Sequence, residues 1–320
     1  MTPPPTYRAH SVSDLLNVIP TLFGFVPRDS FVGICLQGDR LRFGFRLRID
    51  LPEPANIAGV ADVVAGHLDR GEGDRVILVG LGSCTDSARG MVQAVRDALR
   101  LKAVEVAVWA DDERWWSDDN DAGTPWRQDM FHESIVKAIS HGQVIRPDRS
   151  CIEQEFKLGE RAVSQSDLID AQAEYELRRV RSGSSDVNAG VAHIAALMAT
   201  ISDSAELQDD ALILVAIWLR NLLVRDHFWF AIDQRNAREG LSQWAHVASR
   251  LPGVWRAAPL SLASFCAWQA GDGVRALLAA EAALEAQPDY ALAALMLRVV
   301  EEGLPPTSWT RMRSSIHADA

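Results

Sequence analysis

The sequence predicts an α/β N-terminal half, with a mixed and largely parallel sheet that includes an antiparallel hairpin, and an all-α, tetratricopeptide-like C-terminal half. Three observations support this. The chain has 320 residues, more than the ~250–300 that usually share one hydrophobic core. Strand and helix patterns alternate in the first half, and only helical patterns follow later. Because the pattern weakens between residues 142 and 159, we expect two domains, 1–150 and 151–320.

The first half should contain a helix capped by Ser11, a hairpin of two strands around Gly38 and Asp39, and then alternating helices and strands. This alternation is typical of a covered parallel sheet. The polar residues 111–129 predict a long loop. The helices and strands are expected over residues 11–22, 31–36, 40–50, 55–70, 74–82, 86–101, 104–110 and 131–140.

The second strand of the hairpin has an arginine face opposite an apolar face, because its residues alternate strictly. The arginine face could attract an anionic partner. It could equally be the solvated side of an edge strand that uses charge to block aggregation. The arginines of this face are Arg40, Arg42, Arg46 and Arg48.

The second half should consist of helices over residues 166–181, 186–201, 205–231, 238–250, 259–269, 273–286 and 290–302. Residues 257–302 follow a tetratricopeptide-like pattern, with Trp268 in a first helix, a Gly-Asp turn, an alanine-rich helix and then Pro288. One to one and a half repeats cannot stand alone, so they should lean on the preceding helices. The end after Leu304 is expected to fray.

Composition and charge disfavour several classes of function. The net charge of -11 and the pI of ≈ 5.2 argue against nucleic acid as a partner. The N-terminus lacks the pattern of a signal peptide, and the most apolar run, residues 211–219, is shorter than the ~20 residues that cross a bilayer. We therefore expect a cytoplasmic protein with no membrane contact. The cysteines form no metal-binding pattern and indicate reduced thiols: Cys35, Cys84, Cys151 and Cys266.

A strand-to-helix turn, GLGSCTDSARG, is the most enzyme-like local feature. Gly82, Ser83 and Thr85 could offer donors to an anion at a helix N-terminus. However, Thr85 stands where a dinucleotide-binding motif needs its third glycine, and no GK[ST] follows. An ordinary turn with glycines for close packing is therefore the preferred interpretation of the segment.

The following segment combines acidic residues with adjacent tryptophans. Asp111, Asp112 and their acidic neighbours do not have calcium-loop spacing, so solvated charges are the preferred interpretation, with no metal and no cofactor expected. Arg114, Trp115 and Trp116 could stack on a planar ligand, or they could pack under the loop. No GxSxG, HExxH or catalytic cysteine pattern is present, so the sequence does not decide whether the protein is an enzyme.

Several motifs together resemble an actinobacterial family of unknown function with LLGFxPxxSLV-like and RWWS…GTP motifs and a helical C-terminal region. The matching text is LLNVIPTLFGFVPRDSFVGI, RWWS at residues 114–117, the GTP of residues 123–125, and AWQAGD…PDYALA. Family members often carry cysteines between RWWS and GTP, whereas this chain has Asp118, Asp119, Asn120 and Asp121. The resemblance implies a bacterial cytoplasmic protein and no particular activity.

Two hypotheses follow. The first is a non-catalytic binding or scaffold protein that contacts another protein. The alternative is an enzyme that binds a nucleotide or another small, anionic molecule at the carboxyl edge of the sheet. Three segments would then converge in one pocket; their candidate residues are Gly24, Pro27, Asp29, Ser30, Gly82, Ser83, Thr85, Arg114, Trp115 and Trp116.

Overall fold

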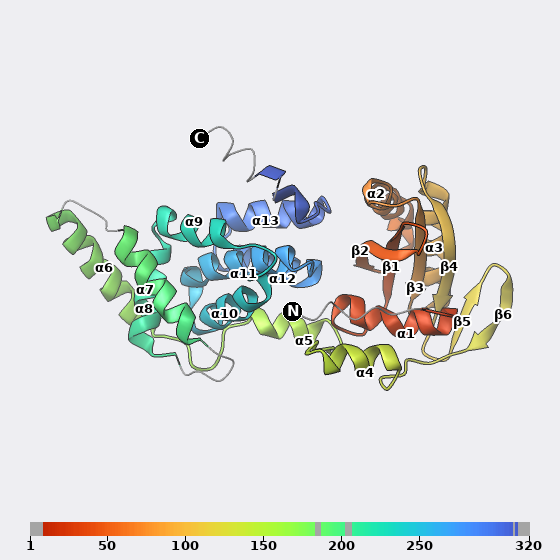
Figure 1. The fold of residues 1–320 in the computed structure, drawn as a ribbon, viewed down its shortest axis with the longest axis horizontal. Helices are drawn as coiled ribbons and strands as arrows, with labels where there is room; N and C mark the ends of the chain where they lie inside the picture. The colour runs from red at the N-terminus through yellow and green to blue at the C-terminus, as the bar shows by residue number, and fades with distance from the viewer. Residues whose placement is uncertain (1–8, 183–186, 202–206, 310, 313–320) are drawn as a thin grey trace. The chain divides into compact units, whose positions relative to one another are not determined.

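The chain forms an α/β unit followed by a helical unit, as the sequence predicts (Figure 1). The structure is a computed structural model that describes residues 9–182, 187–201, 207–309 and 311–312. The two compact units are Met1–Cys151 and Ile152–Ala320.

A six-stranded sheet forms the centre of the N-terminal unit, with the strand order β2-β1-β3-β4-β5-β6. The strands are β1 (Ser30–Gln37), β2 (Arg42–Asp50), β3 (Arg75–Leu81), β4 (Ala103–Ala110), β5 (Arg114–Ser117) and β6 (Asn120–Pro125). The helices of this unit are α1 (Val12–Phe23), the 3₁₀ turn η1 (Pro54–Asn56), α2 (Ile57–Arg70), α3 (Thr85–Ala98) and α4 (Glu133–Ser140).

The sheet is mixed, but the expectation that it is largely parallel is wrong. Among the described strands only β3 and β4 pair in parallel; the other four pairings are antiparallel. Helix α3 connects β3 to β4 and makes them parallel neighbours, as a crossover should. Helix α2 likewise connects β2 to β3, but these two strands are not neighbours, because β1 lies between them. Strand β1 pairs with both β2 and β3 in antiparallel orientation.

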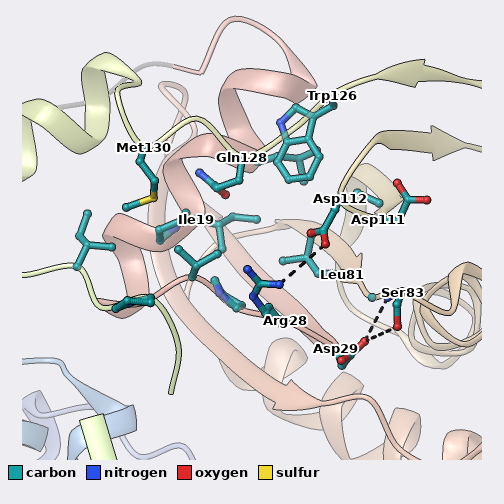
Figure 2. A pocket seen from close by; sticks show the side chains of 18 residues that line it. Ile19, Arg28, Asp29, Leu81, Ser83, Asp111, Asp112, Trp126, Gln128 and Met130 are labelled. Atoms are coloured by element: carbon teal, nitrogen blue, oxygen red, sulfur yellow. Dashed lines mark hydrogen bonds and ion pairs between the residues drawn. The ribbon is translucent and has the colours of Figure 1, made fainter. Parts of the chain in front are cut away.

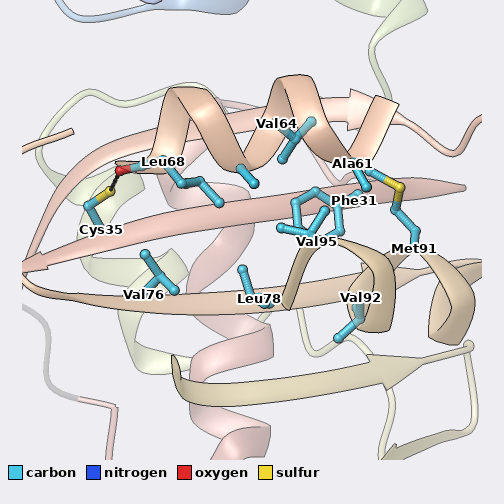
Figure 3. Close-up of a cluster of buried hydrophobic side chains, with 11 residues drawn as sticks. Phe31, Cys35, Ala61, Val64, Leu68, Val76, Leu78, Met91, Val92 and Val95 are labelled. Carbon is cyan, nitrogen blue, oxygen red and sulfur yellow. Dashed lines mark hydrogen bonds between the residues drawn. The ribbon is translucent and has the colours of Figure 1, made fainter. Parts of the chain in front are cut away.

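The apolar core of this unit lies between the sheet and helices α2 and α3 (Figure 3). The apolar face of β2, including Phe45, Leu47 and Ile49, packs against the core, as its alternation predicts. Burial of this apolar surface, at roughly 25 cal/mol per Å², is the main force that holds the layers together. The core side chains are Phe31, Cys35, Ala61, Val64, Ala65, Leu68, Val76, Leu78, Met91, Val92 and Val95.

The arginine face of β2 is divided between structural and exposed side chains. Arg46 Nε donates to a backbone carbonyl of α1 at 3.1 Å. The side chain of Arg48 is only 7% exposed and its guanidinium lies 5.5 Å from the centre of the Phe25 ring. Arg40 and Arg42, at the other end, are exposed. The face is thus not a uniformly solvated edge, because half of it supports the end of α1.

A second hairpin, β5 and β6, lies within residues 111–129, where a long loop was expected; that expectation is wrong for residues 114–125. Trp116 lies opposite Trp109 of β4, and Trp115 lies opposite Ala110. Cross-strand aromatic pairs stabilise a sheet, and this contribution outweighs the polar composition of the segment. Adjacent strand residues point to opposite faces, so the two indoles of β5 separate.

Within the described residues, the helical unit has the helices that the sequence predicts, with one difference. Residues 186, 205 and 206, with which two of these helices were expected to begin, lie outside the described residues. The single helix expected over residues 205–231 is two helices, because Asn221 caps the second and accepts a hydrogen bond from Leu223 N at 3.0 Å. From residue 150 onward the segments are α5 (Ser150–Glu153), η2 (Gln154–Phe156), α6 (Gln165–Ser182), α7 (Val187–Thr200), α8 (Asp209–Leu219), α9 (Leu222–Ala231), α10 (Ala237–Arg250), η3 (Gly253–Arg256), α11 (Ala257–Gln269), α12 (Gly273–Ala286) and α13 (Ala291–Glu301).

Helix α11 is the centre of this unit, since every one of its residues is buried. It packs against α10, α12 and α13. The end of the chain does not fray directly after Leu304: Trp309 is 4% exposed and stacks on Trp229. No helix among the described residues combines the length and the apolar character needed to cross a bilayer.

Candidate functional site

A pocket of about 420 Å³ lies in the α/β unit at the carboxyl ends of β3 and β4 (Figure 2). These strands are parallel, so their last residues meet at the same edge, where Gly82 N donates to Ala110 O at 3.0 Å. Ligands of open α/β sheets commonly bind at this edge. The lining residues are Leu16, Ile19, Pro20, Val26, Pro27, Arg28, Asp29, Leu81, Gly82, Ser83, Ala110, Asp111, Asp112, Trp126, Gln128, Met130, Ile145 and Pro147.

The loop after α1 forms one wall of the pocket. Gly24 ends the helix with a left-handed backbone, φ 76°, and its N–H donates to Pro20 O. Two backbone hydrogen bonds then hold the loop beside Arg146: Val26 N donates to Arg146 O at 3.1 Å, and Arg146 N donates to Gly24 O at 2.8 Å. Glycine adopts positive φ without strain, and the sequence motif GFVPRDS is therefore fixed against the pocket.

Asp29 is the most constrained polar residue of the pocket. Its φ is 41°, a region that non-glycine residues rarely adopt. Its Oδ1 accepts hydrogen bonds from Ser83 N at 3.2 Å and Ser83 Oγ at 3.4 Å. A Cβ at Gly82 would lie 3.2 Å from the same oxygen. Aspartate and asparagine tolerate this region better than other non-glycine residues, and the bonds from Ser83 fix the direction of the carboxylate.

The end of β4 supplies two further carboxylates. Asp111 Oδ1 accepts hydrogen bonds from Glu113 N at 2.8 Å and Arg114 N at 2.7 Å, which forms the turn into β5. Asp112 Oδ2 lies 3.9 Å from Arg28 Nη1, with both side chains largely exposed. Such an exposed ion pair is weak, so Arg28 neutralises Asp112 only in part.

Trp126 and Gln128 form the opposite wall (Figure 2). Gln128 Nε2 donates to Oδ1 of Asn17, a buried residue of α1, at 3.0 Å. Asp129 N donates to the same oxygen at 2.8 Å. The indole Nε1 of Trp126 is buried and has no hydrogen-bond partner among the described residues. This wall is therefore anchored to α1 and leaves one buried donor unsatisfied.

Of the candidate residues from the sequence, the pocket brings together Pro27, Asp29, Gly82 and Ser83. The loop before β1 and the turn after β3 do converge. The convergence also includes Arg28 of the same loop, and Asp111 and Asp112, which follow β4.

The other candidates do not line the pocket. Gly24 shapes the loop, and the buried hydroxyl of Ser30 donates to Arg28 O and accepts from Arg48 Nε. Thr85 is the first residue of α3. The RWWS residues belong to the hairpin, where Arg114 binds carbonyls of β6, and Gly123 packs directly on the Trp116 indole.

Sequence reasoning missed the opposite wall. No motif marked Trp126 or Gln128, and the position of Gln128 depends on Asn17, more than a hundred residues earlier in the chain. Arg146 also gave no signal, since its contacts with the loop after α1 are made by its backbone, irrespective of side-chain type.

The turn after β3 does not offer an open anion site. The Ser83 N–H already donates to the Asp29 carboxylate, so an anion would have to displace that charge. Among the described residues, no group of three or more histidines, cysteines or acidic residues is arranged to hold a metal ion. The charged groups of the lining that could contact a ligand are mainly carboxylates, those of Asp29, Asp111 and Asp112, and they lie beside an apolar wall.

These features define a class: an α/β unit with a pocket at the carboxyl edge of a mixed sheet, joined to an all-helical unit. A family model described as a domain of unknown function, DUF4192, matches residues 13–307, and the chain belongs to that family. No curated protein and no solved structure matches the chain.

Proposed function

We propose that the α/β unit binds a small molecule in the pocket at the carboxyl ends of β3 and β4. The observation that carries this proposal is Asp29 at the pocket wall: its backbone is left-handed, and Ser83 N donates to its carboxylate. A carboxylate fixed in this way loses little conformational freedom when it accepts a hydrogen bond from a ligand.

The size and lining of the pocket support the same proposal. Small-molecule sites commonly enclose ~300–1,000 Å³ and combine apolar walls with a few fixed polar groups. The pocket of about 420 Å³ has an apolar wall from α1, β3 and Trp126, and its polar groups gather on the side of Asp29 and Asp111. The same pocket serves the enzyme hypothesis, and turnover of a bound molecule would distinguish catalysis from binding.

A thermal-shift screen with metabolites tests the proposal, because a ligand present at 100 times its Kd stabilises the folded state by ~2.7 kcal/mol. Met130→Trp places a large ring on an exposed lining residue and should abolish the shift. Leu101→Trp changes an exposed leucine outside the pocket lining and should keep it. A shift that is the same in both variants would place the ligand elsewhere.

A second candidate function, a scaffold, rests on an apolar stripe of α6. Ile169, Leu177 and Val180 are 54%, 58% and 78% exposed. At 100° per residue they lie on one side of the helix, well away from the buried Leu168. The proposal also rests on the tetratricopeptide-like pattern expected of residues 257–302, whose helices α11, α12 and α13 pack on one another.

The occupant that fits this stripe is α6 of a second copy of the chain, in antiparallel orientation. Asp167 and Asp170 lie near the start of α6 and its arginines near the end, so antiparallel helices place these opposite charges together. Arg178 and Arg179 also pair with Glu174 and Glu176 of the same helix. The charged residues are Asp167, Asp170, Glu174, Glu176, Arg178, Arg179 and Arg181.

Analytical ultracentrifugation tests this self-association. The wild-type chain should form a concentration-dependent dimer, and Leu177→Lys should make it monomeric, while Leu101→Lys, an equally apolar-to-charged change on an exposed residue of the α/β unit, should not. A wild-type chain that remains monomeric at high concentration would refute the scaffold proposal.

A further inference from the structure

We infer that the ligand of the pocket is a small organic cation, an amine or guanidine attached to an apolar body. This inference rests on the proposed function, since it assigns the class of ligand for the same site. It follows from the balance of charge in the lining, from the atoms that remain available, and from the apolar and aromatic wall.

The charge of the lining is negative. Asp29, Asp111 and Asp112 contribute three carboxylates, and Arg28 is the one cationic side chain among the described lining residues. Arg28 lies 3.9 Å from Asp112, which leaves Asp29 and Asp111 as the carboxylates without a cationic side chain bound to them. A cation entering the pocket would be attracted to this edge, and an anion would be repelled.

The hydrogen bonds of the two carboxylates leave suitable acceptor atoms. Both bonds that Asp29 accepts end on Oδ1, and both bonds that Asp111 accepts also end on Oδ1. Within the described part of the chain, the Oδ2 atom of each is left to accept from a ligand. An ammonium or guanidinium has several donors and forms charge-assisted bonds with such oxygens.

The rest of the lining suits the body of such a ligand. Ile19, Leu81 and Trp126 offer apolar surface in the same cavity (Figure 2), and an indole ring attracts cations through its face. The lining therefore combines an apolar and aromatic wall with the carboxylates of Asp29 and Asp111.

The anionic ligand that the sequence suggested is less well supported. Its expected donor, the Ser83 N–H, is bound to Asp29. A phosphate at that turn would lie beside the Asp29 carboxylate, and two like charges in contact repel each other. Arg28 could bind an anion only on its largely exposed side.

Isothermal titration with matched probes tests the charge of the ligand. Phenethylamine and agmatine represent the cations, 2-phenylethanol is the neutral counterpart of the first, and phenyl phosphate is the anion. We expect the amines to bind at least tenfold more tightly than the alcohol, the equivalent of ~1.4 kcal/mol, and the phosphate not to bind.

Three variants connect the result to the pocket. Asp29→Asn keeps the shape, the acceptor for Ser83 and a residue type that tolerates positive φ, and it should weaken amine binding about tenfold. Arg28→Gln should strengthen amine binding, since it removes the competing cation. Asp39→Asn, in the exposed turn of the first hairpin, should change nothing.

The outcomes separate the two proposals. Tighter binding of the alcohol or the phosphate, abolished by Met130→Trp, would overturn the cationic class and leave the pocket as a binding site. Amine binding that Asp29→Asn does not weaken would also overturn the cationic class. An absence of binding by all the probes, or binding that Met130→Trp leaves intact, would count against the pocket itself.

Discussion

Arg275 and Glu155 form a bidentate ion pair within the helical unit: Arg275 Nε and Nη2 donate to the two carboxylate oxygens of Glu155 at 2.7 and 2.9 Å. The pair joins α12 to the 3₁₀ turn η2, and both side chains are largely buried. Burial lowers the pKa of Arg275, but hydrogen bonds to Glu155 and Asp272 outweigh it and raise the pKa overall. Bidentate pairs of this kind are among the strongest charge-assisted contacts.

Glu155→Gln should destabilise the helical unit by about 2 kcal/mol, because it leaves a mostly buried guanidinium with Asp272 as its remaining anionic partner. Chemical denaturation followed by circular dichroism measures the change. Glu302→Gln is the matched control, since Glu302 pairs with Arg298 on the surface at 3.5 Å and should cost less than ~0.5 kcal/mol. Equal effects of the two substitutions would contradict the structural role of Glu155.

Trp309→Ala should destabilise the helical unit by ~3–5 kcal/mol, the usual cost of removing a buried aromatic ring. The Trp309 ring is stacked 5.3 Å from Trp229 and meets Phe265 edge-on at 5.1 Å. The unfolding midpoint checks this, with Leu295→Ala, at a 44% exposed position of α13, as the control. A Trp309→Ala midpoint equal to that of the wild type would mean that the end of the chain contributes no stability.

Gly73→Ala should cost more than Gly142→Ala, although both glycines have positive φ, 98° and 84°. A Cβ at Gly73 would lie 2.0 Å from Leu36 O, whereas nothing lies within 4 Å of one at Gly142. Left-handed backbone alone costs ~1–2 kcal/mol, and the clash at Gly73 should add several kcal/mol because a backbone carbonyl must move. Unfolding of the α/β unit in denaturant measures both variants; similar costs would mean that the strand end relaxes freely.

The sequence predicts the elements of the fold better than their pairing. The alternation along β2 correctly assigns Phe45 and Leu47 to the core, because a strand has a strict period of two. The position of β1 between β2 and β3 has no comparable signal, since strand order depends on long-range packing. The β5–β6 hairpin was not predicted because its residues are mostly polar. It is stabilised by cross-strand contacts such as that of Trp116 with Trp109.

The candidate site was only half accessible to sequence reasoning for a related reason. Ser83 and Asp111 each follow a strand, so the expected topology places both of them at the carboxyl edge of the sheet. The opposite wall cannot be placed in this way, because the buried Asn17 of α1 positions Gln128 and the backbone of Asp129. The arginines of β2 also show that alternation does not determine burial. Arg48 and Arg42 belong to the same arginine face, but the side chain of Arg48 is buried and Arg42 is exposed.

Cys84 should be the most reactive thiol of the chain, since it is exposed at the N-terminus of α3 and accepts a hydrogen bond from Ser87 Oγ at 3.3 Å. Hydrogen bonds from Ser87 stabilise the thiolate and lower the pKa of Cys84, so its labelling by iodoacetamide should reach half of its maximal rate at a lower pH than that of an ordinary cysteine. Burial raises the pKa of Cys35 and of Cys266, and these thiols should stay unlabelled until the chain unfolds.

Ser87→Ala should move the Cys84 profile to higher pH and slow its labelling near pH 7, as followed by mass spectrometry of the separate peptides. A profile that Ser87→Ala leaves in place would show that the hydroxyl does not stabilise the thiolate.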